Sequence, residues 1–411
     1  MRITFRIFLY ICAVILNSSI MEQLFQLYTD LIKRTETSFI RYLHDKINWQ
    51  SRLIVIVGAR GVGKTTMLLQ HIKLSDATSK SLYVSADNTY FTAHSLYDTA
   101  DNFHKMGGKF LYIDEAHKYK GWSQEVKMMY DNLPDLNIIV TGSSILDIGK
   151  STDADLSRRA IRYTMDGMSF REYINMTRGL KIPAYTFDEI INNAVRLPDE
   201  ITHPLPIWNE YILRGSYPFF AMDDYYSRIN NVVNQTLEVD IPSFAAMNAT
   251  TSRKLKKLLF VIAQSSPFKP NISEIGRAIE CDRSTVTDYI VYMEKAGLLR
   301  QLRTPGNGMS LIERPEKLFL ANTTLIHALG EDKPNIGNIR ETAFFSLMSV
   351  NNIVKSSPVS DFLISGKTFE VGGKSKTQRQ IKDTPDSFVV KDDIENGYLN
   401  VIPLWCFGMN Y

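Results

Sequence analysis

A glycine-rich loop between an apolar run and a helical stretch constrains this chain more than any other feature. Residues 53–57 read Leu-Ile-Val-Ile-Val, residues 58–66 read Gly-Ala-Arg-Gly-Val-Gly-Lys-Thr-Thr, and residues 67–72 continue with a helical pattern. A buried strand that turns through glycines into a helix aims several backbone N–H groups, and the positive end of the helix dipole, at one point. The sequence therefore predicts a loop that binds the phosphates of a nucleotide.

The residues of this loop predict its ligands. The glycines let the backbone approach a phosphate without a Cβ in the way, and Lys64 reaches the β- and γ-phosphates as a point charge. The Thr65 hydroxyl can bind Mg²⁺. We therefore expect ATP and Mg²⁺ as ligands and assign Lys64 a catalytic role. The expected nucleotide-binding residues are Gly58, Ala59, Arg60, Gly61, Val62, Gly63, Lys64, Thr65 and Thr66.

A second apolar run, residues 109–113, ends in an acidic pair, Asp114 and Glu115. This pattern resembles a Walker B strand. We expect Asp114 to hold Mg²⁺ through its water shell, and Glu115 to polarise the water that attacks the γ-phosphate. An acidic pair after a strand can also be a solvated loop, but the phosphate-binding loop upstream favours the catalytic role.

A third apolar run, residues 136–140, is followed by hydroxyl side chains at residues 141–144. Ligands bind at the carboxyl edge of a parallel sheet, so Thr141 and Ser143 are candidate sensors of the γ-phosphate. The alternative is that Ser143 or Ser144 caps the next helix.

Two arginines, Arg158 and Arg159, precede the last expected strand. Either one is a candidate arginine finger that neutralises transition-state charge, in the same chain or in a neighbouring copy. The alternative is that both arginines pair with nearby aspartates on the surface.

The apolar runs predict strands at residues 53–57, 81–85, 110–113, 138–140 and 160–163. Strands that alternate with helical stretches form a parallel sheet with helices on both faces. The second strand lies between the two phosphate-site strands in sequence order, as in the branch of P-loop ATPases that carries a catalytic glutamate. This order agrees with the role expected of Glu115.

Length and composition indicate several domains in a reducing compartment. A chain of 411 residues predicts two or three domains. The net charge of +3 is too small to indicate a nucleic-acid or membrane partner. The three cysteines, Cys12, Cys281 and Cys406, are too widely spaced for a disulfide framework or a zinc motif. We expect a cytoplasmic protein.

The first twenty residues have a different character from the rest. Arg2 and Arg6 precede an apolar stretch, residues 7–16, and this order alone is typical of a signal peptide. The stretch is too short for an ordinary transmembrane helix, and export would separate an ATP site from its ATP. We therefore expect translation to start at Met21, where the first of several helical segments within residues 21–47 begins. The alternative is an uncleaved membrane anchor, so a membrane partner is expected only if residues 1–20 are retained.

The second half of the chain predicts a helical lid, residues 166–250, and then a winged helix-turn-helix, residues 251–320. Three short helices are followed by a strand-forming tail, with Ser284 expected as the N-cap of the third helix and Gly297 as its end. DNA is a candidate partner of the start of that helix. The alternative is packing against protein, because the helix is not strongly basic. The expected contact residues are Arg283, Ser284, Thr285 and Thr287.

Several motifs together resemble one family. The segments Gly-Ala-Arg-Gly-Val-Gly-Lys-Thr-Thr, Phe-Leu-Tyr-Ile-Asp-Glu-Ala-His, Val-Thr-Gly-Ser-Ser, Met-Ser-Phe-Arg-Glu-Tyr and Pro-Glu-Lys-Leu-Phe-Leu-Ala-Asn-Thr-Thr-Leu resemble prokaryotic AAA-type (AAA_14) ATPases with a C-terminal DUF4143 domain. The resemblance runs from about Met21 to the end. It implies an ATPase domain at residues 21–165 and a small restriction-endonuclease-like α/β domain at residues 321–411. The Gly-Gly-x-Pro of related archaeal ATPases appears here as Gly-Ser-Tyr-Pro at residues 215–218, a departure within the lid.

The tail resembles a PD-(D/E)xK nuclease core. Glu341 lies on an expected helix, Asp361 starts an apolar strand, and Glu370 lies on the next strand. Carboxylates can hold Mg²⁺ and a lysine can activate water. Gly372 occupies the usual lysine position, but Lys374 lies on the same face of the strand as Glu370 unless a bulge intervenes. The alternatives are DNA cleavage and an inert nuclease-like platform.

These patterns predict an ATPase whose hydrolysis drives rearrangement of a winged-helix and nuclease-like tail. One alternative is a nucleotide switch with negligible turnover that assembles complexes on DNA or protein. Another is a DNA nuclease gated by ATP. A protein client and a second copy of the chain are further candidate partners.

Overall fold

The computed structural model describes residues 21–75, 77–143, 156–245, 247, 249–265, 267–305, 315–330 and 334–411. By their contacts, these residues form two compact units. The first unit comprises the described residues up to Val57 together with Lys64–Thr164, and the second comprises Gly58–Gly63 together with Met165–Tyr411. The expectations for residues 1–20 and for Ser144 lie outside the described residues.

The first unit contains a sheet with the strand order β2-β3-β4-β1-β5. Strand β4 thus separates the strand of the glycine-rich loop from the strand that carries Asp114. The pairs β2–β3 and β3–β4 are parallel. Every residue of β1 is buried, as expected of a Val- and Ile-rich strand covered on both faces. The strands are β1 (Leu53–Gly58), β2 (Ser81–Ser85), β3 (Phe110–Asp114), β4 (Asn137–Ser143) and β5 (Ile161–Met165).

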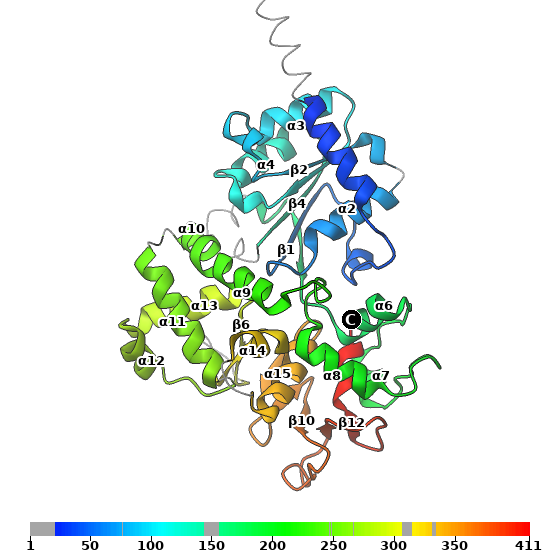
Figure 1. Ribbon diagram of the computed structural model, residues 1–411, viewed down its shortest axis with the longest axis vertical. Helices are drawn as coiled ribbons and strands as arrows, with labels where there is room; N and C mark the ends of the chain where they lie inside the picture. The colour runs from blue at the N-terminus through cyan, green and yellow to red at the C-terminus, as the bar shows by residue number, and fades with distance from the viewer. Residues whose placement is uncertain are drawn as a thin grey trace, which may run out of the picture. The chain divides into compact units, whose positions relative to one another are not determined.

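Helices cover both faces of this sheet (Figure 1). Helix α2 (Lys64–Leu74) lies on one face, and α3 (Leu96–Lys105) and α4 (Trp122–Asn132) lie on the other. Right-handed crossovers produce this arrangement, because the chain moves along the sheet in one direction after β1 and in the opposite direction after β2. The side chain of Ser95 caps α3 by accepting the N–H of Asp98.

Helical segments are expected at residues 21–47. Residues 21–34 are helical, and a 3-10 turn, His44–Lys46, follows before β1. Among the described residues, no helix is both long enough and apolar enough to cross a membrane.

The second unit begins with the helices expected in the lid. In α6, Ser169 and Glu172 form a capping box, which explains the Ser-Phe-Arg-Glu pattern at its start. A π-helical turn, Thr236–Asp240, joins α9 to α10. The helices are α6 (Phe170–Arg178), α7 (Phe187–Ile191), α8 (Pro204–Arg214), α9 (Tyr225–Gln235) and α10 (Ile241–Ala245).

Three further helices and a two-stranded antiparallel sheet follow in the order expected of a winged helix. They are α11 (Ala249–Ser265), α12 (Ile272–Ile279), α13 (Arg283–Lys295), β6 (Leu299–Leu302) and β7 (Lys317–Leu320). The prediction of Ser284 as N-cap is wrong. Asp282 is the N-cap, because its carboxylate accepts the N–H of Thr285 at 2.8 Å and thereby starts the helix earlier.

The chain ends in a second sheet with the order β12-β11-β10-β9-β8. Strands β8, β9 and β10 pair antiparallel, and β10, β11 and β12 pair parallel. Phe344 of α15 packs against Phe362, Phe369 and Phe407, with ring centroids 4.8–5.5 Å apart. The elements are α14 (Thr323–Leu329), α15 (Ile336–Met348), β8 (Val354–Ser356), β9 (Phe362–Ile364), β10 (Lys367–Gly372), β11 (Ser387–Lys391), β12 (Val401–Pro403) and the 3-10 segment Leu404–Met409.

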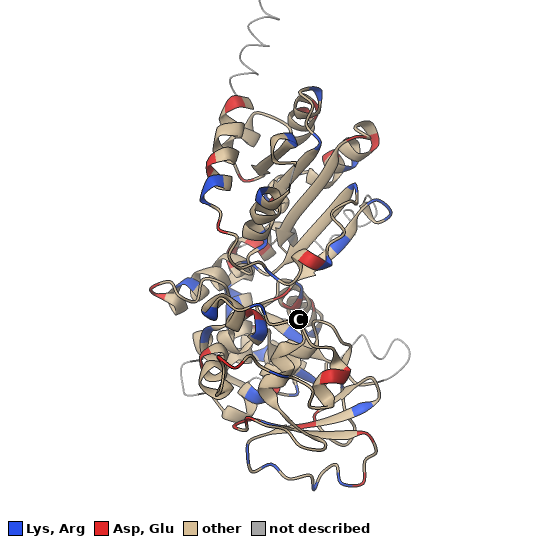
Figure 2. Ribbon diagram, turned by 90° about the vertical axis from the view of Figure 1, so that its right-hand side faces the viewer, with Lys and Arg blue, Asp and Glu red and all other residues tan. Residues whose placement is uncertain are grey.

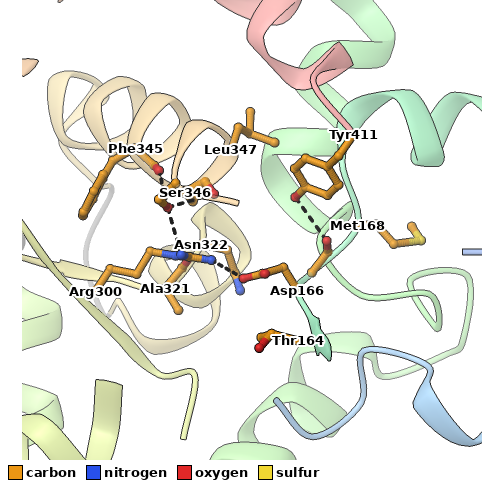
Figure 3. Close-up of polar contacts among 12 residues, drawn as sticks. Thr164, Asp166, Met168, Arg300, Ala321, Asn322, Phe345, Ser346, Leu347 and Tyr411 are labelled. Carbon is orange, nitrogen blue, oxygen red and sulfur yellow. Dashed lines mark hydrogen bonds and ion pairs between the residues drawn. The ribbon is translucent and has the colours of Figure 1, made fainter. Parts of the chain in front are cut away.

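An ion pair fixes the segment that leaves β5. The guanidinium of Arg300, on β6, donates to the Asp166 carboxylate at 2.6 Å and to Ser349 Oγ at 2.8 Å (Figure 3). Elsewhere, basic and acidic residues are interspersed along both units (Figure 2), in agreement with the small net charge.

Candidate nucleotide-binding site

The glycine-rich loop lies where the sequence predicts it, between the end of β1 and the start of α2. Gly61 and Gly63 have φ values of 84° and 100°, a left-handed region in which glycine has no Cβ penalty. Helix α2 begins at Lys64, and Thr65 and Thr66 lie in its first turn. The first N–H groups of an α-helix have no acceptor within the helix, which suits a helix start to binding an anion.

Asp114 is the centre of a hydrogen-bond cluster at the carboxyl end of β3. Thr65 Oγ1 donates to Asp114 Oδ2 at 2.6 Å, and the Tyr83 hydroxyl donates to the same oxygen at 2.7 Å. Thr141 Oγ1 and the backbone N–H of Glu115 donate to Asp114 Oδ1. The structure therefore brings together Thr65 and Asp114, the two residues expected to serve one Mg²⁺ ion.

The donor set of this cluster fits magnesium. Mg²⁺ prefers oxygen ligands and is usually held by one or two carboxylates together with water and the phosphates of its substrate. Asp114 supplies a carboxylate that is only 2% exposed, and Thr65 supplies a hydroxyl. Among the described residues, no three His, Cys, Asp or Glu side chains gather as a metal site.

Glu115 has an unusual backbone conformation. Its φ of 50° lies in the left-handed region, which costs a residue with a side chain about 1–3 kcal/mol and is concentrated at functional sites. Its carboxylate lies 3.5 Å from Nε2 of His117, and His117 Nδ1 accepts the N–H of Ser143 at 3.4 Å. His117 thus connects the expected catalytic glutamate to the end of β4.

Both sensor candidates lie at the carboxyl end of β4 and are buried. Thr141 contacts Asp114 directly and also accepts the N–H of Glu115 at 3.3 Å. Ser143 contacts His117 through its backbone. The structure thus connects Thr141 and Ser143 to the two acidic residues, and their role as sensors stays a prediction.

Two residues of this cluster were not expected from the sequence. Tyr83 lies inside an apolar strand, where a tyrosine is most often a core residue. Burial and the nearby charge of Asp114 raise the pKa of Tyr83 well above its usual range, so the phenol remains a donor. His117 lies two residues after Glu115, and nothing in the sequence indicates its contact with the end of β4.

Arg60 makes a contact that no local pattern predicts. Within the second unit its guanidinium donates to both carboxylate oxygens of Asp240, at 3.1 and 3.2 Å, and the Asp240 side chain has no exposed area. A Cβ on Gly61 would come within 2.9 Å of Phe219, and a Cβ on Gly297 within 2.7 Å of Ala59. Residues that are distant in sequence therefore pack closely against the glycine-rich loop.

The arginine-finger candidates have different environments. Arg159 pairs with the Asp131 carboxylate through two contacts of 2.9 and 3.0 Å, which is the alternative considered from the sequence. Arg158 is exposed. Arg158 is the better remaining candidate for a finger.

The expected DNA-contacting residues lie at the start of α13, as predicted. Ser284 Oγ and Thr285 Oγ1 both donate to the Asp282 carboxylate, and Thr287 Oγ1 donates to the backbone of Arg283. These hydroxyls stabilise the helix start in this structure, and contact with DNA stays a prediction.

The nuclease-like carboxylates gather around lysines, but one predicted member is wrong. Strand β10 ends at Gly372 and Lys374 lies in the turn that follows, so Lys374 does not continue the face of Glu370. The turn brings Lys376 back to pair with Glu370 instead. The strand ends at the glycine pair, residues 372–373, and Lys374 is therefore not part of the acidic cluster.

A second lysine, Lys317, lies between the other two acids. Its Nζ is 2.9 Å from Glu341 and 4.0 Å from Asp361. Burial, together with the charges of Glu341 and Glu370, raises the pKa of Asp361 to about 6. The three acids therefore influence one another, although they do not form a ready metal site among the described residues.

A family comparison matches the part of the chain that contains the candidate nucleotide-binding site. Residues 50–174 match AAA_14, an AAA domain. The chain carries an AAA-type domain. Residues 205–335 match DUF8612, a domain of unknown function, so the expected DUF4143 domain is not confirmed.

An uncharacterized protein of Methanocaldococcus jannaschii is 27% identical over 323 residues, which cover 72% of this chain and 68% of that protein. The AMPPCP-bound structure of DnaA from Aquifex aeolicus is 16% identical, covers 62% of this chain and 85% of its own, and has a TM-score of 0.30. A casein complex of Hsp104 from S. cerevisiae is 16% identical, with coverages of 67% and 53% and a TM-score of 0.32.

Proposed function

We propose that this protein binds ATP with Mg²⁺ and hydrolyses it, and that hydrolysis rearranges the winged-helix and C-terminal regions. The observation that carries the proposal is the 2.6 Å contact of Thr65 with Asp114 at the start of α2. A phosphate loop supplies the hydroxyl ligand of Mg²⁺ and the strand opposite supplies the aspartate, so both must meet at one point. The match of residues 50–174 to an AAA domain supports the same assignment.

The roles of individual residues follow from this placement. The backbone of Gly58–Gly63 and the Lys64 ammonium hold the phosphates, while Thr65 and Asp114 serve the metal. Mg²⁺ would neutralise charge that develops on the phosphate oxygens. Glu115 orients and polarises the attacking water. Thr141 or Ser143 reports whether the γ-phosphate is present, through the hydrogen bonds of β4 to Asp114 and His117.

The proposal divides the chain into an ATPase domain at residues 21–165, a helical lid at 166–250, a winged helix at 251–320 and a C-terminal domain at 321–411. The order of α11, α12, α13 and the β6–β7 sheet supports the winged helix. We propose that α13 contacts DNA through its exposed start, where Arg283 lies.

Multiple-turnover phosphate release from ATP and Mg²⁺, measured with and without duplex DNA, tests this function. We expect sustained turnover that DNA stimulates, because one chain carries both the ATPase site and the DNA-contacting helix. A single turnover followed by stable nucleotide binding would instead indicate the switch. Absence of nucleotide binding would contradict both the ATPase and the nucleotide switch.

A second candidate function is cleavage of DNA by the C-terminal domain. The observation that favours it is the proximity of Glu341 on α15, Asp361 just before β9 and Glu370 on β10, with Lys317 between Glu341 and Asp361. Plasmid nicking with Mg²⁺ or Mn²⁺ should be lost in Asp361→Ala if this function is real. Identical nicking by the parent protein and Asp361→Ala would rule out cleavage by this domain, which would then be a binding platform.

A further inference from the structure

The carboxylate of Asp114 has its full complement of hydrogen bonds. Oδ2 accepts from Thr65 at 2.6 Å and from Tyr83 at 2.7 Å, and Oδ1 accepts from Thr141 and from the N–H of Glu115. An ionised carboxylate offers about four lone-pair sites. A metal-bound water can therefore reach Asp114 only by replacing one of the present donors.

The four donors differ in how readily they can be replaced. The N–H of Glu115 is part of the backbone, and Thr141 and Tyr83 are 0% and 7% exposed. Thr65 is more exposed and is itself the expected ligand of Mg²⁺. Thr65 is thus the side-chain donor that can turn most readily, and its hydrogen bond to Oδ2 is the one that a metal-bound water would replace.

Loss of the Thr65 bond leaves Tyr83 as the remaining donor to Oδ2. We propose that Tyr83 is a positioning residue, which holds Asp114 in the orientation that receives the Mg²⁺ water shell once Thr65 has turned to the metal. This role rests on the proposed binding of ATP with Mg²⁺. The phenol comes from β2, whose residue Tyr83 pairs with Tyr112 of β3, so its ring is fixed by the sheet that also fixes Asp114.

Tyr83→Phe isolates this role, because it keeps the ring and removes only the hydroxyl. Partners that orient a metal ligand typically affect metal affinity 10–100-fold when they are removed. We expect Tyr83→Phe to raise the Mg²⁺ concentration for half-maximal binding of a fluorescent ATP analogue by about tenfold. Affinity for the analogue in EDTA should change less than about twofold, because the phosphate loop is untouched.

Tyr112→Phe provides a matched control. Tyr112 is equally buried on the neighbouring strand, but its hydroxyl faces Ser81 and Tyr28 rather than Asp114. We expect Tyr112→Phe to retain the Mg²⁺ dependence of the parent protein. Thermal melting of both variants, together with binding in EDTA, confirms that each is folded.

The outcomes separate this proposal from the function on which it rests. An unchanged Mg²⁺ dependence in Tyr83→Phe, or an equal shift in Tyr112→Phe, would overturn the role of Tyr83 while leaving ATP binding intact. If the parent protein binds no analogue with or without Mg²⁺, the proposed function fails and the role of Tyr83 fails with it. A shift confined to Tyr83→Phe supports the positioning role.

Discussion

At the scale of single residues, Asp114 is the centre of the proposed site, because four donors bind its carboxylate. The position of Lys64 at the start of α2 and the contact of Thr65 with Asp114 were predictable, because a glycine-rich loop and an acidic strand end carry their signals in adjacent residues. Tyr83 was not predictable, because a tyrosine in an apolar strand shows nothing of where its hydroxyl points. The contact depends on the parallel register of β2 and β3, which no local pattern reveals.

Lys64→Ala should abolish nucleotide binding. Lys64 is 5% exposed at the start of α2, and no other loop side chain is expected to reach the β- and γ-phosphates. Equilibrium binding of a fluorescent ATP analogue checks this, with affinity expected to fall at least about 100-fold. Lys105→Ala is a suitable control because Lys105 is exposed on α3 and pairs with Asp101. Equal affinity in Lys64→Ala and the control would show that the loop is not the binding site.

At the scale of elements, every strand predicted in the first unit is present. The observed strands β3, β4 and β5 extend beyond the predicted ends, since polar residues such as Asp114 and Ser143 still belong to the sheet. A hydrophobic run shows where a strand is buried but not where its hydrogen bonding ends. The same limit explains the error at Lys374, where the strand ended earlier than its alternation suggested.

The C-terminal sheet should respond to pH through Asp361. Its folded pKa of about 6 lies above the unfolded value of about 3.9, so stability is lost as the pH rises from about 4 to about 6. Asp361→Asn cannot ionise, and its amide oxygen can still accept the N–H of Val371. We expect this variant to be more stable than the parent at pH 7.5, by on the order of 3 kcal/mol or less, and similar to it at pH 4.

Urea unfolding followed at both pH values measures this difference. Asp383→Asn, which changes an exposed carboxylate of the same region, serves as the control and should show no such dependence. A variant at Asp361 that is less stable than the parent at pH 7.5 would show that the ion pair with Lys317 outweighs the burial of the carboxylate.

At the scale of the whole molecule, the phosphate loop contacts residues that are far away in the sequence. The order of helices and strands could be read from the sequence, since each proposed domain has its own pattern of them. The pairing of Arg60 with Asp240 could not be, because 180 positions separate the two residues. The π-helical turn that ends at Asp240 leads through α10 toward α11, the first helix of the proposed winged helix.

Arg60→Ala should destabilise the second unit more than Asp240→Asn does. Asp240 is fully buried and loses a bidentate partner in the first variant, whereas Arg60 is partly exposed and can be hydrated in the second. Removing one partner of a buried ion pair typically costs about 3–5 kcal/mol. Thermal melting of both variants provides the comparison. Equal midpoints in the two variants would show that this ion pair does not stabilise the unit.

The central claim, that the Asp114–Glu115 strand end hydrolyses ATP bound at the phosphate loop, is tested most directly by Glu115→Gln. Multiple-turnover phosphate release and analogue binding are measured on the same preparation. Loss of a general base typically slows turnover by about 10²–10⁴-fold. We predict a fall of at least about 100-fold in turnover with nucleotide affinity unchanged, whereas undiminished turnover in Glu115→Gln would contradict the account.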